Sequence, residues 1–235
     1  MNHLRNAMIS VNQTTYETSW RSKLDVEDTR NIIPVSDEQA KAAQEALKTL
    51  QGVGRFLKDT FGTIPQDVVG MLGGDYLRVR RAENLVRTIE KARKRLDENG
   101  IETPDASPSL AIPIMIAAAD ESRDDLQDIW AALLEAAATP KKSKAFRLKF
   151  IELAKELDPF DALTLKGMYR VSPNDFLDDA VLAMIAEKIG GSRDQVRVSV
   201  ANLEATGMII RPSGNNSRHY VALSPLAREF LLAVQ

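Results

Sequence analysis

The segment DDLQDIWAALLEAAA, residues 124–138, contains the clearest helical pattern in the chain. Its apolar side chains recur three and four residues apart, so they share one face when successive residues are placed about 100° apart around a helix. A stripe of this width predicts a helix buried at the centre of a mainly helical protein. The stripe consists of Leu126, Ile129, Trp130, Leu133, Leu134 and Ala137.

Helical patterns also precede this segment. Residues 109–119 are almost wholly apolar and predict a short core helix, and residues 75–99 predict an amphipathic helix that ends at Gly100. Two further helices are expected at about 37–50 and 66–72. The apolar sector of the 75–99 helix consists of Ala82, Leu85, Ile89, Ala92 and Leu96.

The opposite face of the 75–99 helix is basic. Such a face is usually solvated, and this is the interpretation that we favour; the functional alternative is contact with a nucleic acid backbone or an acidic partner surface. Gly73-Gly74 lies in no phosphate-binding motif, so we interpret this pair as a turn and Asp75 as the start of the helix. The basic face consists of Arg80, Arg87, Lys91 and Lys94.

Several helices are expected after residue 138. Asp158 and Pro159 are suited to the cap and first turn of one helix, and Ser192 to the cap of another. The spacing of Phe146, Phe150, Leu153 and Leu157 predicts a helix that ends just before Asp158. The remaining helices are expected at about 176–189, 193–206 and 225–234.

Two short β-prone segments surround Gly214-Asn215-Asn216 and predict a hairpin. Helix, helix, glycine-bounded turn, helix and hairpin in this order are typical of a winged helix-turn-helix, which we assign to residues 158–235. SRDQVRVSVANLEATGMI, residues 192–209, would then contain the recognition helix. The predicted fold class is all-α with a small β-hairpin wing. The side chains expected to hold the recognition helix on the core are Val196, Val200 and Leu203.

The charge of the outward face of this helix bears on whether it contacts protein or DNA. Residues 158–235 carry eight basic and nine acidic side chains, whereas a DNA-binding module usually has a basic footprint. We therefore expect contact with a protein partner or a second copy of the chain. The residues farthest from the core are Asp194, Val198, Ala201 and Ala205. The alternative is DNA binding, for which the candidates are Arg193, Arg197, Arg211, Arg218 and His219.

Composition argues against several chemistries. The 235 residues include no cysteine and only two histidines, His3 and His219, which disfavours thiolate nucleophiles, conventional zinc sites and Ser/His/Asp triads. We therefore assign no catalytic residue, no cofactor, no metal and no small-molecule substrate. The formal charge of −2 gives no general attraction to nucleic acid or anionic lipid.

The N-terminal segment lacks the apolar core of a signal peptide. The longest apolar segment, LAIPIMIAAA at residues 110–119, is too short to span a bilayer. Together with the absence of cysteine, these features predict a soluble cytoplasmic protein and argue against membrane contact.

Five acidic residues gather between positions 120 and 128. They could suggest a site for a divalent metal, but they lie around the first turns of a helix predicted at 122–138, where carboxylates complement the helix dipole. We favour the dipole interpretation. The residues are Asp120, Glu121, Asp124, Asp125 and Asp128.

Three segments in a fixed order carry a resemblance to a known family. They are GGDYLRVRRAENL (73–85), in which Asn84 follows Asp75 by nine residues, LQDIWAALL (126–134) and ELDPFDA (156–162). With their neighbours, over about residues 68–165, these segments resemble the bacterial abortive-infection alpha family. The resemblance implies a helical protein of antiphage defence and supplies no catalytic residues.

We therefore divide the chain into a polar N-terminal arm (1–35), a helical domain of abortive-infection alpha type (36–157) and a winged-helix-like domain (158–235). The predicted function is non-enzymatic antiphage defence through protein contacts, with the winged helix as a docking or sensing module. The alternative is a DNA-binding transcriptional regulator.

Overall fold

The computed structural model describes residues 58, 76–101, 104, 106–172, 175–211 and 220–235. The chain divides into two compact units, Met1–Ala42 and Ala43–Gln235, and every contact given below lies in the second. Several predicted features fall outside the described residues. They are the helices at 37–50 and 66–72, the Gly73-Gly74 turn, Asp75, the hairpin tip at 214–216, Arg218 and His219.

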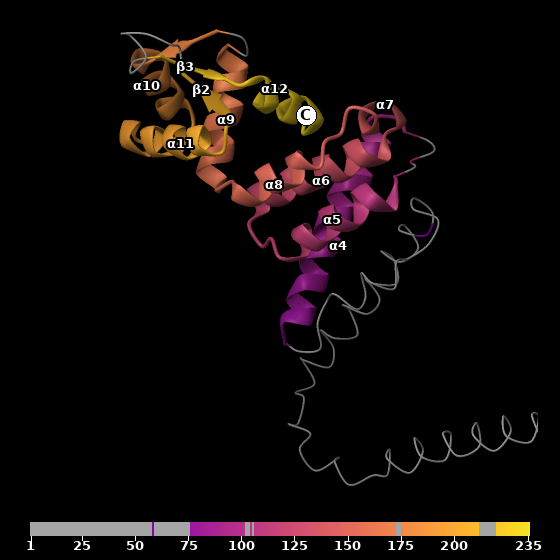
Figure 1. Ribbon diagram of the computed structural model, residues 1–235. Helices are drawn as coiled ribbons and strands as arrows, with labels where there is room; N and C mark the ends of the chain where they lie inside the picture. The colour runs from indigo at the N-terminus through magenta and orange to yellow at the C-terminus, as the bar shows by residue number, and fades with distance from the viewer. Residues whose placement is uncertain (1–57, 59–75, 102–103, 105, 173–174, 212–219) are drawn as a thin grey trace, which may run out of the picture. The chain divides into compact units, whose positions relative to one another are not determined.

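The described part of the chain contains nine helices and three short strands (Figure 1). This composition confirms the predicted class, all-α with a small β-hairpin. The helices are α4 (Tyr76–Glu98), α5 (Pro108–Ala119), α6 (Asp124–Ala138), α7 (Pro140–Ser143), α8 (Lys149–Glu156), α9 (Pro159–Val171), α10 (Asp179–Lys188), α11 (Arg193–Ala205) and α12 (Pro225–Ala233). The strands are β1 (Leu177–Asp178), β2 (Ile209–Ile210) and β3 (Tyr220–Leu223).

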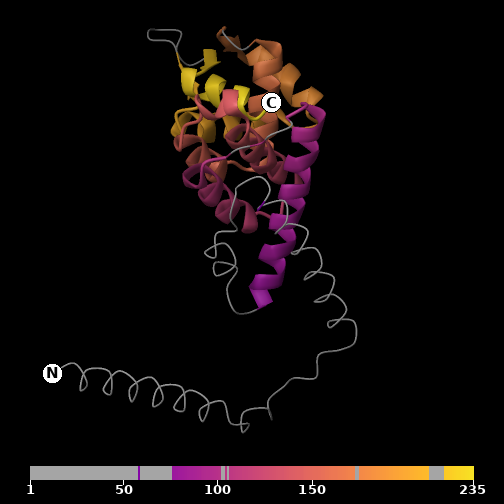
Figure 2. The same cartoon turned by 90° about the vertical axis from the view of Figure 1, so that its right-hand side faces the viewer.

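Helix α6 is the centre of the packing, as its sequence predicts. It contacts α4, α5, α8, α9 and α12, and the long α4 packs along it (Figure 2). All six residues of its apolar stripe are buried, and so is the predicted apolar sector of α4. Gly100 adopts φ 65° just after α4, in the left-handed region expected of a glycine that ends a helix.

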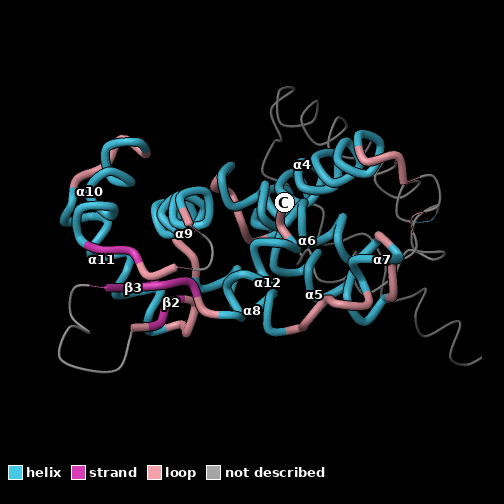
Figure 3. The backbone as a smooth tube through the Cα atoms, turned by 90° about the horizontal axis from the view of Figure 1, so that it is seen from above, coloured by secondary structure: helices cyan, strands magenta, loops and turns pink. Residues whose placement is uncertain are grey.

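Helices α9, α10 and α11 pack on one another beside an antiparallel sheet of order β1-β3-β2 (Figure 3). Strand β3 pairs with both neighbours, through Leu177 with Val221 and through Ile209 with Leu223. Strand β1 corrects the prediction of a helix at 176–189. Leu177 pairs with β3, and the helix begins only after Asp178, whose carboxylate accepts a hydrogen bond from the backbone N–H of Val181 at 2.9 Å.

One cluster of buried apolar residues extends from α4 to α12. The rings of Phe150 in α8 and Phe230 in α12 meet edge to face, with centroids 5.9 Å apart. Residues on both sides of position 158 therefore share a core, and the division into domains at 157/158 stays a prediction. Among the described helices, none combines the length and the apolar character that crossing a membrane requires.

One of the two helix caps predicted from the sequence forms its capping hydrogen bond, and the other does not. Ser192 caps α11 as predicted. Asp158 occupies the N-cap position of α9, but its carboxylate makes no capping hydrogen bond to the helix backbone. Oδ1 of Asp158 instead accepts a hydrogen bond of 2.9 Å from Nη1 of Arg123. The charged guanidinium takes the place of the helix N–H groups as the partner of this carboxylate.

Candidate protein-contact surface

Helix α11 is fixed at its start by a reciprocal cap. The hydroxyl of Ser192 accepts a hydrogen bond from the backbone N–H of Gln195, and the side-chain oxygen of Gln195 accepts one from the backbone N–H of Ser192 at 2.8 Å. Such a box satisfies two N–H groups that a helix start leaves free. The inner face is buried as predicted, through Val196, Val200 and Leu203. The cap and this inner face set which residues point outward.

The opposite side of α11 carries the four residues that the helical spacing placed farthest from the core. We call Asp194, Val198, Ala201 and Ala205 the α11 outer face. All four are exposed, and Val198 is 61% exposed, the largest value among the exposed large apolar side chains of the described residues. Three of the four side chains are small or apolar, so the surface has little capacity to bind phosphate.

The arginines around the α11 outer face lie close to acidic groups of the same helix. Arg197 lies 3.7 Å from the carboxylate of Asp194, and Nε of Arg211 donates to both carboxylate oxygens of Glu204 at 2.9 Å. Arg193 is exposed beside them. A DNA phosphate would have to compete with Asp194 and Glu204 for two of these cations.

The strand that follows α11 adds one exposed apolar residue that was not predicted from the sequence. Ile210 in β2 is 41% exposed, while its neighbour Ile209 is buried. Successive side chains of a strand alternate between faces, and this alternation is the signal that could have identified it. Helix α11 and β2 contact each other, so Ile210 is an exposed apolar side chain on the element that packs next to α11.

The basic face predicted for α4 is partly neutralised by neighbouring carboxylates. Arg80, Arg87 and Lys94 are exposed, but Lys94 lies 3.7 Å from Glu98 of its own helix. Lys91 makes ion pairs at 2.7 Å with Asp124 and with Asp128 of α6. Burial acts to lower the pKa of Lys91, and hydrogen bonds and charge from the two aspartates outweigh it and raise the pKa. Lys91 therefore joins two helices.

Four of the five acidic residues at 120–128, all except Asp125, make ion pairs with described cations. Asp120 accepts from Arg81 at 2.6 Å, and Glu121 accepts from Arg123 at 2.9 Å. Helix α6 begins at Asp124, so only Asp124 and Asp125 lie in its first turn, where they suit the dipole interpretation. Within the described ranges, no group of three His, Cys, Asp or Glu residues could hold a metal ion.

The three segments that carry the family resemblance have structural roles in this chain. The amide of Asn84 donates to the carbonyl of Ala119 at 3.0 Å, which joins α4 to the end of α5. The amide of Gln127 donates to the carbonyl of Glu121 at 2.8 Å. Asp161, buried in the third segment, accepts from Asn202 of α11 at 3.5 Å. These polar residues therefore hold helices and loops together.

The described part of the chain is thus a helical protein whose signature residues join its helices and whose α11 carries a small, nearly neutral exposed face. The family model described as abortive infection alpha matches residues 78–234, about two thirds of the sequence. The chain belongs to the abortive infection alpha family. The match extends beyond the segments of the resemblance to include α9–α12. Neither a curated protein nor a solved structure matches the chain significantly.

Proposed function

We propose that this chain is a non-enzymatic antiphage defence protein that acts in the cytoplasm through protein contacts, and that residues 158–235 are a winged helix used for docking or sensing. The family supports the defence context. The order α9, β1, α10, α11, β2, β3 and the sheet order β1-β3-β2 support the winged helix. Strands β2 and β3 follow the helix pair α10 and α11, and β3 also pairs with β1, which lies between α9 and α10.

The observation that carries the contact proposal is the chemistry of the α11 outer face. Val198, Ala201 and Ala205 present apolar atoms to solvent on a helix whose other side is fixed in the core. Interfaces between proteins place apolar side chains at the centre and charges at the rim. The α11 outer face follows this pattern, since Arg197 lies at its flank and is close to Asp194.

The experiment compares phage plaques on bacteria that express the wild-type chain, Val198→Glu or Leu148→Glu. Leu148 is a matched control, since it is 59% exposed, close to the 61% of Val198, and lies before α8 rather than on α11. Both exposed substitutions should change the free energy of unfolding by no more than about 0.5 kcal/mol. We expect Val198→Glu to abolish protection and Leu148→Glu to retain it.

Two outcomes would contradict different parts of the proposal. Equal plaque counts with and without the wild-type chain, across a broad phage panel, would reject the defence function. Full protection by Val198→Glu would reject the α11 outer face as the contact surface. Sedimentation of the purified wild-type and Val198→Glu chains then separates a second copy from another protein as the partner, because only self-association changes the sedimentation of the purified chain.

A further inference from the structure

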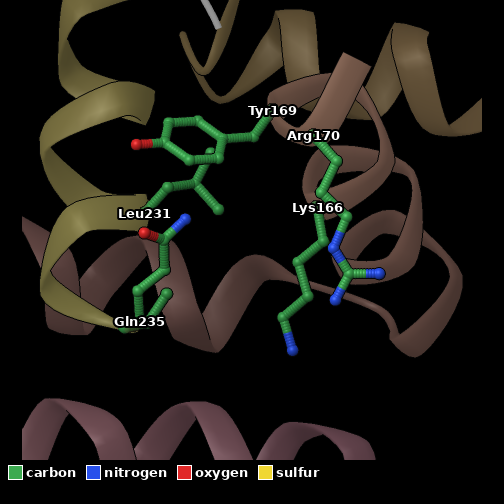
Figure 4. Close-up of a pocket in the computed structure, with 6 residues that line it drawn as sticks. Lys166, Tyr169, Arg170, Leu231 and Gln235 are labelled. Carbon is green, nitrogen blue, oxygen red and sulfur yellow. The ribbon is translucent and has the colours of Figure 1, made fainter. Parts of the chain in front are cut away.

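A pocket of about 270 Å³ opens between α9 and α12, away from the α11 outer face (Figure 4). Its volume lies just below the range for sites that bind drug-sized molecules, roughly 300–1,000 Å³. A pocket of this size can enclose a small molecule but not a segment of a macromolecule. The lining residues are Lys166, Tyr169, Arg170, Leu231, Val234 and Gln235.

Two cations form one wall of this pocket. Lys166 and Arg170 are four residues apart on α9, so they lie on one face of the helix, one turn apart. Figure 4 shows their side chains extending alongside each other, while Tyr169 directs its hydroxyl towards α12 and Gln235 lies across from the two cations. Polar groups of α9 and the polar side chain of Gln235, which follows α12, therefore surround one space.

These cations are not compensated within the described part of the chain. No hydrogen bond or ion pair joins the side chain of Lys166 or Arg170 to another described residue, whereas Lys91 and Arg123 each pair with carboxylates. No acidic side chain lines the pocket. Like charges one turn apart on a helix repel each other, and an anion bound between them would relieve this repulsion.

The helix dipole accounts for only one of the two cations. Arg170 lies in the last turn of α9, where a positive charge complements the helix dipole. Lys166 lies one turn earlier, and the dipole effect falls off within the last turn. The dipole therefore does not account for Lys166 at the same wall.

We propose that this pocket binds a small molecule that carries a phosphate group. The planar guanidinium of Arg170 can donate two parallel hydrogen bonds to phosphate oxygens, and the ammonium of Lys166 supplies a second charge. The Tyr169 hydroxyl and the Gln235 amide can contact the remaining oxygens. Leu231 and Val234 offer apolar surface to the carbon skeleton of the ligand. This ligand adds to the proposed protein contacts, and no reaction is assigned to it.

Calorimetric titration of the full chain with inorganic phosphate, adenosine 5′-monophosphate and adenosine, in a buffer free of phosphate, tests the proposal. We expect adenosine 5′-monophosphate to bind and adenosine not to bind, because only the former carries the anion. Binding of inorganic phosphate as tightly as the monophosphate would identify the free ion as the ligand of this site, and weaker binding would identify a phosphorylated molecule.

The double variant Lys166→Gln/Arg170→Gln keeps the side chains long and removes both charges, so it should weaken binding at least about tenfold. Lys141→Gln/Arg147→Gln is the matched control, since it removes two exposed cations that lie outside the pocket. Its affinity should equal that of the wild type. Circular dichroism checks that each variant is folded, and Lys166→Gln alone decides the result if the double variant does not fold.

Three results would overturn the proposal. One is the absence of binding of both phosphate-bearing probes to the wild type at concentrations up to about 10 mM. A second is equal weakening in the two double variants, which indicates general attraction to surface charge. The third is equal binding of adenosine and its monophosphate, which indicates an apolar ligand.

Discussion

The side-chain amide of Asn84 in α4 donates a hydrogen bond of 3.0 Å to the backbone carbonyl of Ala119, the last residue of α5. The last carbonyls of a helix have no partner within the helix, and Asn84 satisfies one of them from a position that is 8% exposed. Three residues earlier on α4, Arg81 pairs with Asp120 at 2.6 Å. The first family segment therefore fastens α4 to the end of α5.

Replacement of Asn84 by alanine is expected to lower the free energy of unfolding by about 1–3 kcal/mol, because it leaves the Ala119 carbonyl without its donor. Urea denaturation followed by circular dichroism measures the change. Glu90→Ala, at an exposed position of the same helix, is the control and should alter the midpoint little. An unchanged midpoint for Asn84→Ala would show that this hydrogen bond contributes nothing to the stability of the chain.

The free energy of unfolding should depend on pH in the acid range through the carboxyl of Glu121. Burial acts to raise the pKa of this carboxyl, but hydrogen bonds and charge from Arg123 outweigh it and hold the pKa below the ordinary value of 4.5. A group whose pKa is lower in the folded state stabilises the fold above its unfolded pKa, and this contribution is lost as the pH falls through the folded value. The contribution of Glu121 is therefore complete above pH 4.5 and decreases below it.

Glu121→Gln should therefore be less stable than the wild type near neutral pH, and the difference should decrease as the pH is lowered below 4.5. Urea midpoints at a series of pH values measure this effect. Glu90→Gln, which removes an exposed carboxyl from the middle of α4, is the control. Its urea midpoint should change with pH in the same way as that of the wild type. Parallel curves for Glu121→Gln would mean that the pair with Arg123 does not shift the titration of Glu121.

How much of this molecule the sequence could predict depends on the distance along the chain between interacting residues. The buried stripe of α6 was predictable because helical spacing is a local property. Strand β1 was missed because it has two residues and exists only through pairing with Val221, more than forty positions later. Lys91 was assigned to a basic face because its partners Asp124 and Asp128 lie on another helix.

The same limit applies to the candidate sites. The exposure of Val198 and Ala201 follows from the period of one helix, so the sequence predicts it correctly. The pocket beside Lys166 and Arg170 was not predictable, since Leu231 of α12 and Gln235, which follows α12, reach it from a segment about sixty residues later. Spacing along α9 places the two cations on one face but does not show which element lies opposite.

The turn between α10 and α11 has no room for a side chain at Gly191 unless the ring of Phe160 moves. A Cβ atom there would overlap Cζ and Cε2 of Phe160, a ring in the third family segment. Gly191→Ala must displace this ring and should cost about 1–3 kcal/mol in the free energy of unfolding. In the background of Phe160→Leu, which removes the ring, the same change should cost less. A double-mutant cycle on urea midpoints measures the coupling. Additive effects of the two substitutions would contradict the close approach.

The last prediction concerns DNA. Binding to random duplex DNA, measured by fluorescence anisotropy at about 50 and 200 mM salt, should be weak and should change little with salt, because the salt dependence grows with the number of phosphates that a protein neutralises. Arg197 and Arg211 already lie near Asp194 and Glu204. The variant Arg193→Ala/Arg197→Ala should therefore bind DNA as the wild type does.

Tight binding that weakens steeply with salt and disappears in Arg193→Ala/Arg197→Ala would reject protein contact as the role of α11 and establish the regulator alternative. Lys166→Gln/Arg170→Gln is the necessary comparison, because a cationic pocket that accepts phosphate could also attract DNA ends. Loss of DNA binding in that variant alone would assign the interaction to the pocket between α9 and α12. The two pairs of cations lie on different helices, so the two variants separate a helix that reads DNA from a pocket that binds phosphate.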